Sequence, residues 1–499
     1  MGEGDGQPRR ITKVETVVEE EKIERELVEV WKIEESSFRM RAKEAECKSF
    51  WHTRKMERKM TEMDWSRMME KEKFVPMIKR SFELVESPLT VEEMVQATKD
   101  AMEEFHLEMV QLFDYYSLLG SGNPYEMQLN AYSSFVEECG VADNSSEFCK
   151  KSDCDTMFIQ TTYVDGAVAA KQLSRYQFCE VFLRIAIAKF CMTTVSPVDP
   201  AASLAKLFEE CIRLNAPSNV MVDRDAFRKD RLYNGECDNV YIQHMKVLQA
   251  LYSRYRIRSK DGERRPTLLN VEGFAKLFED ARLYDAYFTL QETRFCFMWS
   301  RMYTLKEDSS NQKFTNLTYV DFLEALGRAA DCLHLPTDEE LRSNGYADAF
   351  TWKISIELGL EQNAPIIHRR TSSHMHNVKT RPLHEKLSTM FDIMFRRLLY
   401  VPGGMNDYNK DALIRMLKKK DMEANGAAFG EHDAEDFENE NVPETEQQYN
   451  VEEWAAWEAG AYESLEDGGA PKGFDEGAYY EYDSGQEYGS DDYYFFSFY

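Results

Sequence analysis

The chain has 499 residues, of which 43% are hydrophobic, so it is long enough for two or three domains with well-packed cores. It contains no run of about 18 apolar residues and no apolar N-terminal region, which argues against a transmembrane helix and a secretory signal. The net charge is −28, and residues 430–499 hold 21 acidic side chains against one basic side chain, so nucleic acid and anionic membranes are poor partners. Ten cysteines without a framework favour reduced thiols inside a cell.

The first predicted element is an N-terminal helical extension, assigned to residues 1–100. Its second half repeats methionine within a helical pattern, in the stretch HTRKMERKMTEMDWSRMMEKEKF. Two interpretations stay open. The methionines can fill irregular gaps in a core, which we favour, or they can form an adaptable partner-binding face. They are Met56, Met60, Met63, Met68 and Met69.

A short phrase then recurs four times between residues 101 and 335: a leucine, a small polar residue, and an apolar pattern at helical spacing. Side-chain oxygens at such polar positions accept hydrogen bonds from the first free N–H groups of a helix. The predicted helix caps are Asn130, Ser174, Asn270 and Thr318. In three copies a phenylalanine follows four residues after the cap, and we expect these to plug the core: Phe178, Phe274 and Phe322. The first copy is looser and uses Tyr132 and Phe135.

The order of helix, loop, one extended apolar residue, cap and helix resembles the EF-hand superfamily, in which that apolar residue pairs two hands. The phrases LFDYYSLLGSGNPY and LTYVDFLEALGRAAD look like those of EF-hand-like algal and protist proteins associated with flagella. The resemblance implies a mainly α chain with two pairs of degenerate helix-loop-helix units, long flanking helices and a disordered acidic tail. The implied segments after the extension are a first pair at 101–192, a linker at 193–240, a second pair at 241–335, C-terminal helices at 336–425 and the tail at 426–499.

The predicted loops lack the chemistry of calcium sites. A calcium-binding hand needs oxygen ligands at positions 1, 3 and 5, glycine at 6 and glutamate at 12. Among the four ligand positions of the four loops, only Glu126 and Asp321 are carboxylates, and position 6 is never glycine. We therefore expect no calcium binding and no other metal or cofactor. The loops, counted back from each cap, are 122–133, 166–177, 262–273 and 310–321.

Beyond the second pair, the stretch PLHEKLSTMFDIMFRRLLY is the most amphipathic in the chain. Its apolar anchors are Phe391, Met394, Phe395 and Leu398. EF-hand lobes bind such helices in an apolar groove. The helix at 384–399 could fill a groove built on Phe274 and Phe322 in its own lobe, bind a partner, or do neither. We favour the first arrangement. The tail at 426–499 is rich in Glu, Asp, Gly and Tyr and is expected to be disordered alone.

The remaining motifs are weak. Arg369 and Arg370 make Ser372 a candidate site for a basophilic kinase. The nearby histidines in HRRTSSHMH favour a basic surface loop over a metal site, and Cys149 and Cys154 favour structural thiols over zinc. No phosphate-binding loop, dinucleotide fingerprint, G-x-S-x-G or H-E-x-x-H motif is present, so we expect no enzyme activity.

These features favour a structural scaffold or adaptor that contacts other proteins of a large assembly, with no membrane insertion and no small-molecule ligand. The flagellar resemblance implies a component of a ciliary or flagellar axoneme complex, and thus of the cytoskeleton. Two alternatives stay open. One is a calcium-responsive regulatory protein. The other is an accessory subunit of a protist organellar enzyme complex, and in these cases the location would be cytoplasm or an organelle.

Overall fold

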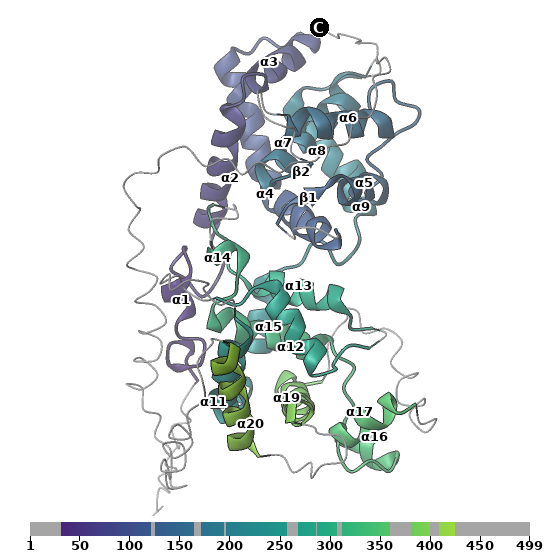
Figure 1. Cartoon of the computed structure of the whole chain (residues 1–499). Helices are drawn as coiled ribbons and strands as arrows, with labels where there is room; N and C mark the ends of the chain where they lie inside the picture. Colours follow the sequence, from purple (N-terminus) through teal and green to yellow (C-terminus); the bar gives the residue numbers. More distant parts are fainter. Residues whose placement is uncertain are drawn as a thin grey trace, which may run out of the picture. The chain divides into compact units, whose positions relative to one another are not determined.

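The computed structural model of the chain describes residues 31–120, 125–163, 171–193, 196–256, 268–285, 287–306, 312–359, 381–399 and 409–424. Within these ranges the chain is mainly helical, with one two-stranded sheet and one isolated bridge (Figure 1). The predicted mainly α class is confirmed. Ser372, the histidines near it, and the acidic tail lie outside the described residues.

The described N-terminal part contains a 3₁₀ turn, η1 (Ile33–Glu35), and three helices, α1 (Arg41–Glu44), α2 (Arg54–Met69) and α3 (Phe74–Leu84). Helix α2 begins at a threonine cap, because the Thr53 side chain accepts from the backbone of Met56. Met56, Met60 and Met68 are buried, whereas Met69 is exposed. Helix α2 packs against α4 (Val91–Leu119) and α7 (Arg175–Ala186). The methionines thus serve mainly as core residues, and this segment is an integral part of the fold.

The first pair of helix–loop–helix units runs from α4 to α7. Its elements after α4 are β1 (Met127–Gln128), α5 (Leu129–Glu138), α6 (Lys151–Thr162), β2 (Gln172–Leu173) and α7, followed by a π-helical turn, η2 (Ile187–Cys191). Strands β1 and β2 pair antiparallel, with Met127 opposite Leu173. The two loops of the pair therefore meet through their backbones.

The second pair runs from α11 to α15 and repeats this arrangement. Its elements are α11 (Gly235–Tyr255), α12 (Val271–Asp280), α13 (Leu290–Ser300), the short α14 (Gln312–Thr315) and α15 (Tyr319–Cys332). An antiparallel bridge joins Leu269 to Leu317. After it come α16 (Asp338–Ser343), α17 (Ala349–Glu357), α19 (Leu383–Leu399) and α20 (Lys410–Ala424). Helix α16 starts with a capping box formed by Thr337 and Glu340.

The expected segment boundaries differ from those in the structure. Residue 100 lies inside the continuous helix α4, and residue 240 lies inside α11. The expected linker at 193–240 is folded into short helices, namely α8 (Pro200–Leu207), η3 (Phe208–Ile212), α9 (Arg213–Asn215), α10 (Arg224–Phe227) and η4 (Arg228–Leu232). Leu204, Leu207 and Phe208 are fully buried, and α8 packs against α4 and α7. This segment belongs to the core because its apolar side chains cover the first pair.

The core of the first pair extends into the second. The large apolar cluster around α4 and α7 includes Phe295, Met298 and Trp299 of α13. The ring of Phe295 stacks on that of Tyr115 in α4, with centroids 5.2 Å apart. The two pairs therefore share a continuous apolar interface. Among the described residues, no helix is both long and apolar enough to cross a membrane.

Candidate functional site: the α19 seat and the Glu324 cluster

Three of the four predicted caps lie at helix starts. The Asn270 side chain accepts from the backbone N–H of Gly273, and that of Thr318 accepts from Asp321. Ser174 is the residue before α7, and its backbone N–H and hydroxyl both donate to the side chain of Gln177, at 2.9 and 3.0 Å. In these copies the leucine is extended as predicted, and Asn270 and Thr318 accept the predicted backbone hydrogen bond. Ser174 is in the predicted cap position, where its hydroxyl donates to Gln177.

The predicted cap at Asn130 needs correction. Helix α5 begins at Leu129, so Asn130 is already its second residue, and the residue in the cap position is Gln128. The residue that pairs with Leu173 is Met127, not Leu129. Both residues are apolar and two positions apart, so a two-residue shift preserves the alternation of apolar side chains. Counted from Met127, the first loop is 120–131, and its ligand positions contain no carboxylate.

The three predicted core plugs are fully buried. Phe178, Phe274 and Phe322 each have no exposed surface. The rings of Phe274 and Phe322 meet edge to face, with centroids 6.3 Å apart, so the two units of the second pair touch through them. Phe178 meets Phe135 in the same way at 5.2 Å. Each exiting helix thus sends one aromatic ring into the centre of its pair.

Helix α19 lies against the second pair, in contact with α11, α12 and α15 (Figure 1). We call this contact surface the α19 seat. Phe391, Met394 and Phe395 are fully buried, and Leu398 is half-buried. The ring of Phe391 lies edge to face with Tyr241 of α11 at 6.0 Å. The apolar face of α19 is therefore covered by the helices of its own chain.

Sequence reasoning missed one anchor and several polar contacts of α19. Ile393 is as fully buried as the predicted anchors, and its i+3 spacing from Met390 was the available signal. At the edges of the helix, Lys386 donates to the carbonyl of Asp331, and Arg397 pairs with Glu357 of α17 at 2.6 Å. Arg396 pairs with Asp348 at 2.8 Å. These pairs fix the orientation of α19 on its seat.

The twelfth position of each loop holds a residue that cannot act as a bidentate calcium ligand. In the corrected first loop it is Ala131, and in the second it is Gln177. In the third it is Gly273, where a Cβ atom would overlap the carbonyl oxygen of Tyr255 at the end of α11. In the fourth it is Asp321, whose carboxylate is held by the chain itself, as described next.

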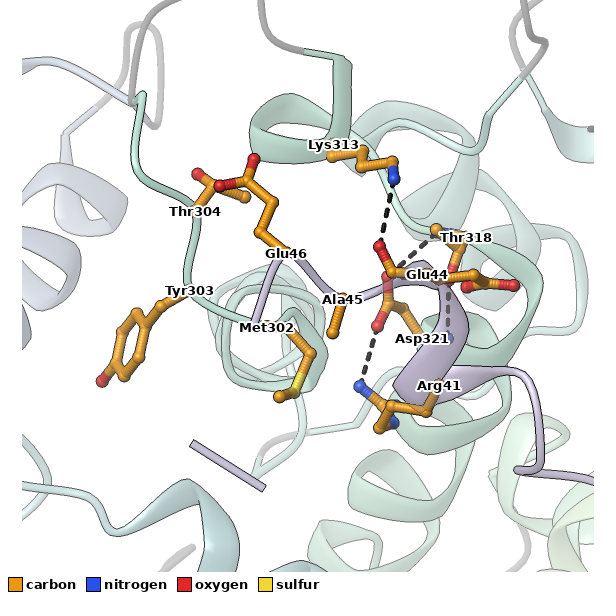
Figure 2. A pocket seen from close by; sticks show the side chains of 10 residues that line it. All are labelled: Arg41, Glu44, Ala45, Glu46, Met302, Tyr303, Thr304, Lys313, Thr318 and Asp321. Atoms are coloured by element: carbon orange, nitrogen blue, oxygen red, sulfur yellow. Dashed lines mark hydrogen bonds and ion pairs between the residues drawn. The ribbon is translucent and has the colours of Figure 1, made fainter. Parts of the chain in front are cut away.

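Arg41 reaches this fourth loop from the N-terminal segment (Figure 2). Its guanidinium lies 3.0 Å from Oδ1 of Asp321 and 2.7 Å from Oε2 of Glu324, both on α15. The other carboxylate oxygen of Asp321 accepts from the backbone and hydroxyl of Thr318. A cavity of about 20 Å³ beside Arg41 has room for a single water. A cationic side chain thus occupies the acidic end of the loop.

Glu324 is the centre of a buried charge cluster. Besides Arg41, it pairs with Arg228 of η4 at 2.9 Å and with Arg328 one turn later at 2.7 Å. Burial opposes the charge on Glu324, but Arg228, Arg41 and Arg328 outweigh it and lower its pKa from 4.5 to about 2. The cluster joins three segments that are far apart in the sequence. We call these four residues the Glu324 cluster.

A second buried polar group lies between α2 and the first pair. Asp64, His106 and Cys179 have ligand atoms within 4.8 Å of one another, which makes them a geometric candidate for a metal ion. However, Arg175 donates to both carboxylate oxygens of Asp64, at 2.7 and 3.0 Å, and Nε2 of His106 lies 2.9 Å from the same carboxylate. A metal ion on Asp64 would meet the guanidinium charge directly, so this donor set suits an ion pair better.

No protein-family model, curated protein or solved structure matches this chain. The site must therefore be interpreted from its own geometry. That geometry consists of a helix seated on its own lobe and of carboxylates paired with arginine. These elements fix helices against one another, and the anchors that α19 buries on its seat are apolar.

Proposed function

We propose that this chain is a non-enzymatic structural scaffold or adaptor built on two degenerate EF-hand-like pairs that are held closed without calcium. The observation that carries the proposal is the burial of Phe391, Met394 and Phe395 on the α19 seat. In helix-in-groove recognition the occupant is an amphipathic helix with anchors at i, i+3 and i+4. Here the chain supplies that occupant itself, so the lobe needs no signal to bind it.

The loops support the same proposal. A calcium sensor must exchange its ion and open a groove when the ion binds. The twelfth position of the third loop has no space for a side chain, and that of the fourth is paired with arginine. These features favour a permanent framework over a switch.

Because α19 occupies its seat, we expect other proteins to bind other surfaces of the chain. We propose that they involve the acidic tail and the N-terminal region, both of which lie partly or wholly outside the described residues. The resemblance of the repeated phrases to flagella-associated proteins supports a place in a ciliary or flagellar axoneme complex. The chain would then be a fixed part of that assembly.

Fractionation of the source cells tests this proposal. Axonemes, cytosol and organelles would be separated, and the chain would be quantified in each fraction by mass spectrometry. We expect it to remain with axonemes after detergent treatment, with equal amounts in calcium and in chelator. Recovery in a respiratory or photosynthetic membrane complex would instead support the organellar alternative. Calcium-dependent release from axonemes would support the regulatory one.

A further inference from the structure

The exiting helices of the two pairs carry the same buried charge pattern. Glu180 of α7 and Glu324 of α15 each lie seven residues after the bridging leucine, Leu173 or Leu317. Both carboxylates are buried, with side-chain exposures of 1% and 0%. Each glutamate is paired with an arginine one turn later, Glu180 with Arg184 at 2.8 Å and Glu324 with Arg328 at 2.7 Å. The pattern is therefore an internal repeat, and in the sequence it takes the form Leu-[Ser/Thr]-x₅-Glu-x₃-Arg at residues 173–184 and 317–328.

A second cation reaches each glutamate from the N-terminal segment. Nζ of Lys71 lies 2.5 Å from Glu180, and the guanidinium of Arg41 lies 2.7 Å from Glu324. Each of these cations also donates to a main-chain carbonyl at the end of the incoming helix. Lys71 donates to Thr161 in the last turn of α6 at 2.9 Å, and Arg41 donates to Ser300 at the end of α13 at 3.2 Å. The two sites share these parts, and the Glu324 site has one more cation, Arg228, which also reaches the carbonyl of Ser300 at 3.4 Å.

The buried glutamate and the helix-end carbonyl together favour a cation that can donate several hydrogen bonds. The last carbonyls of a helix have no partner within the helix and carry partial negative charge, so they attract cations. A buried carboxylate beside them adds a full negative charge that is costly to leave unpaired. A primary ammonium or a guanidinium can satisfy the carboxylate and the carbonyl at once, because each carries several N–H donors. We call each glutamate with its carbonyl a cation socket.

We propose that each pair contains a cation socket that takes an ammonium or guanidinium group, and that residues 31–73 form a strap whose Arg41 and Lys71 plug the two sockets. In a metal-binding loop the bound ion supplies the positive charge. Here Arg41 and Lys71 of the strap supply it. Because plug and socket belong to one chain, the effective concentration of the plug at its socket is high and does not depend on the protein concentration. The inference holds whichever assembly the chain joins.

Further contacts hold the strap in place, both before Arg41 and between the two plugs. Asp238 of α11 accepts from the indole N–H of Trp31 at 3.0 Å and from the backbone of Ser37 at 2.9 Å. The backbone N–H of His52 donates to Asp225 at 2.9 Å. The strap is thus anchored on α11 and α10 from residue 31 onward, and its helix α2 then packs against α4 and α7 of the first pair.

Removal of each plug, followed by chemical rescue, tests the proposal in the full-length chain. We expect Arg41→Ala to speed amide hydrogen exchange in residues 31–53 and in α15, and Lys71→Ala to speed it in α7 and at the end of α6. Methylguanidinium should restore protection in the first variant, and methylammonium should restore it in the second. Tetramethylammonium has the same charge but no N–H donor, so it should restore neither.

Lys43→Ala and Lys73→Ala are the matched controls, because both side chains are exposed neighbours of the plugs in the sequence. The proposal is overturned if each plug variant exchanges like its control, or if tetramethylammonium rescues as well as the N–H donors. If Arg41→Ala does not fold, Lys71→Ala still tests the proposal. Lys71 is only half-buried, so its loss should leave the chain folded. Glu180→Gln then provides a second measurement, since a socket without its carboxylate should no longer respond to methylammonium in the Lys71→Ala background.

Discussion

Leu269 and Leu317 exchange two backbone hydrogen bonds, from each N–H to the other carbonyl, at 3.2 and 2.7 Å. Both side chains are fully buried. The loops of the second pair are therefore joined by the polypeptide itself, at the residue that precedes each helix cap. This bridge fixes where α12 and α15 begin, and it places Phe274 and Phe322 against each other.

Calcium titration should give no binding. Isothermal titration of the full chain with Ca²⁺ up to about 1 mM, the weak end of known EF-hand affinities, should show only heats of dilution. The reason is that the twelfth positions are alanine, glutamine, glycine and an aspartate paired with Arg41. A micromolar site that Asp321→Ala removes would contradict this expectation and revive the regulatory alternative.

The corrected start of α5 can be tested with two asparagine variants. Asn270→Ala should lower the free energy of unfolding by about 1 kcal/mol, because it removes the acceptor for the N–H of Gly273. Asn130→Ala should have almost no effect, since Asn130 is exposed and is not a cap. Urea denaturation of both variants gives the comparison. Equal losses would show that the first loop has the register predicted from sequence.

The aromatic plugs should matter more than the caps. Phe322→Ala should cost roughly 3–5 kcal/mol, because it removes a fully buried ring that touches Phe274 and leaves a cavity. Thr318→Ala, one turn earlier on the same helix, should cost only about 1 kcal/mol. Thermal melts of the two variants check the ranking. A larger effect at Thr318 would mean that the core tolerates the loss of the ring.

The burial of α19 predicts a strong effect of charge at Phe391. Phe391→Asp places a carboxylate among Tyr241, His244 and Phe395, so we expect lower stability and more exposed apolar surface, measured by dye binding. Ser388→Asp is the matched control, because Ser388 lies on the exposed face of the same helix. If Phe391→Asp improved solubility without loss of stability, α19 would have to face a partner rather than its own lobe.

Acid should weaken the Glu324 cluster. The pKa of Glu324 is about 2 in the folded chain against 4.5 for an ordinary glutamate, so its ionisation favours folding at neutral pH. This contribution is on the order of 3 kcal/mol, is complete above about pH 4.5, and is lost as the pH falls towards 2. Urea midpoints measured from about pH 6 to pH 3 should fall more steeply in the native chain than in Glu324→Gln. Parallel slopes would show that Glu324 is not the titrating group.

Local patterns predicted the helices and most caps, because a cap and its helix lie within a few residues of each other. The register of the first loop was mispredicted, since Met127 and Leu129 satisfy the same apolar alternation. The linker expected at 193–240 is instead folded into helices that are too short for apolar periodicity to reveal them. The pairing of Arg41 with Glu324 could not be predicted. Both charges look like ordinary polar positions of a helix until the fold brings together segments about 280 residues apart.

Gly273 limits what a single substitution could add to the third loop. A side chain at that position would collide with the carbonyl of Tyr255 and with the Leu269 side chain. A single codon change to glutamate would therefore damage the packing of α11 before it could supply a ligand. A ligand at this position would first require other substitutions that move the end of α11, and we expect the variants that carry only some of these substitutions to be less stable. A substitution at Gly273 alone therefore cannot give the third loop a ligand at its twelfth position without a loss of packing.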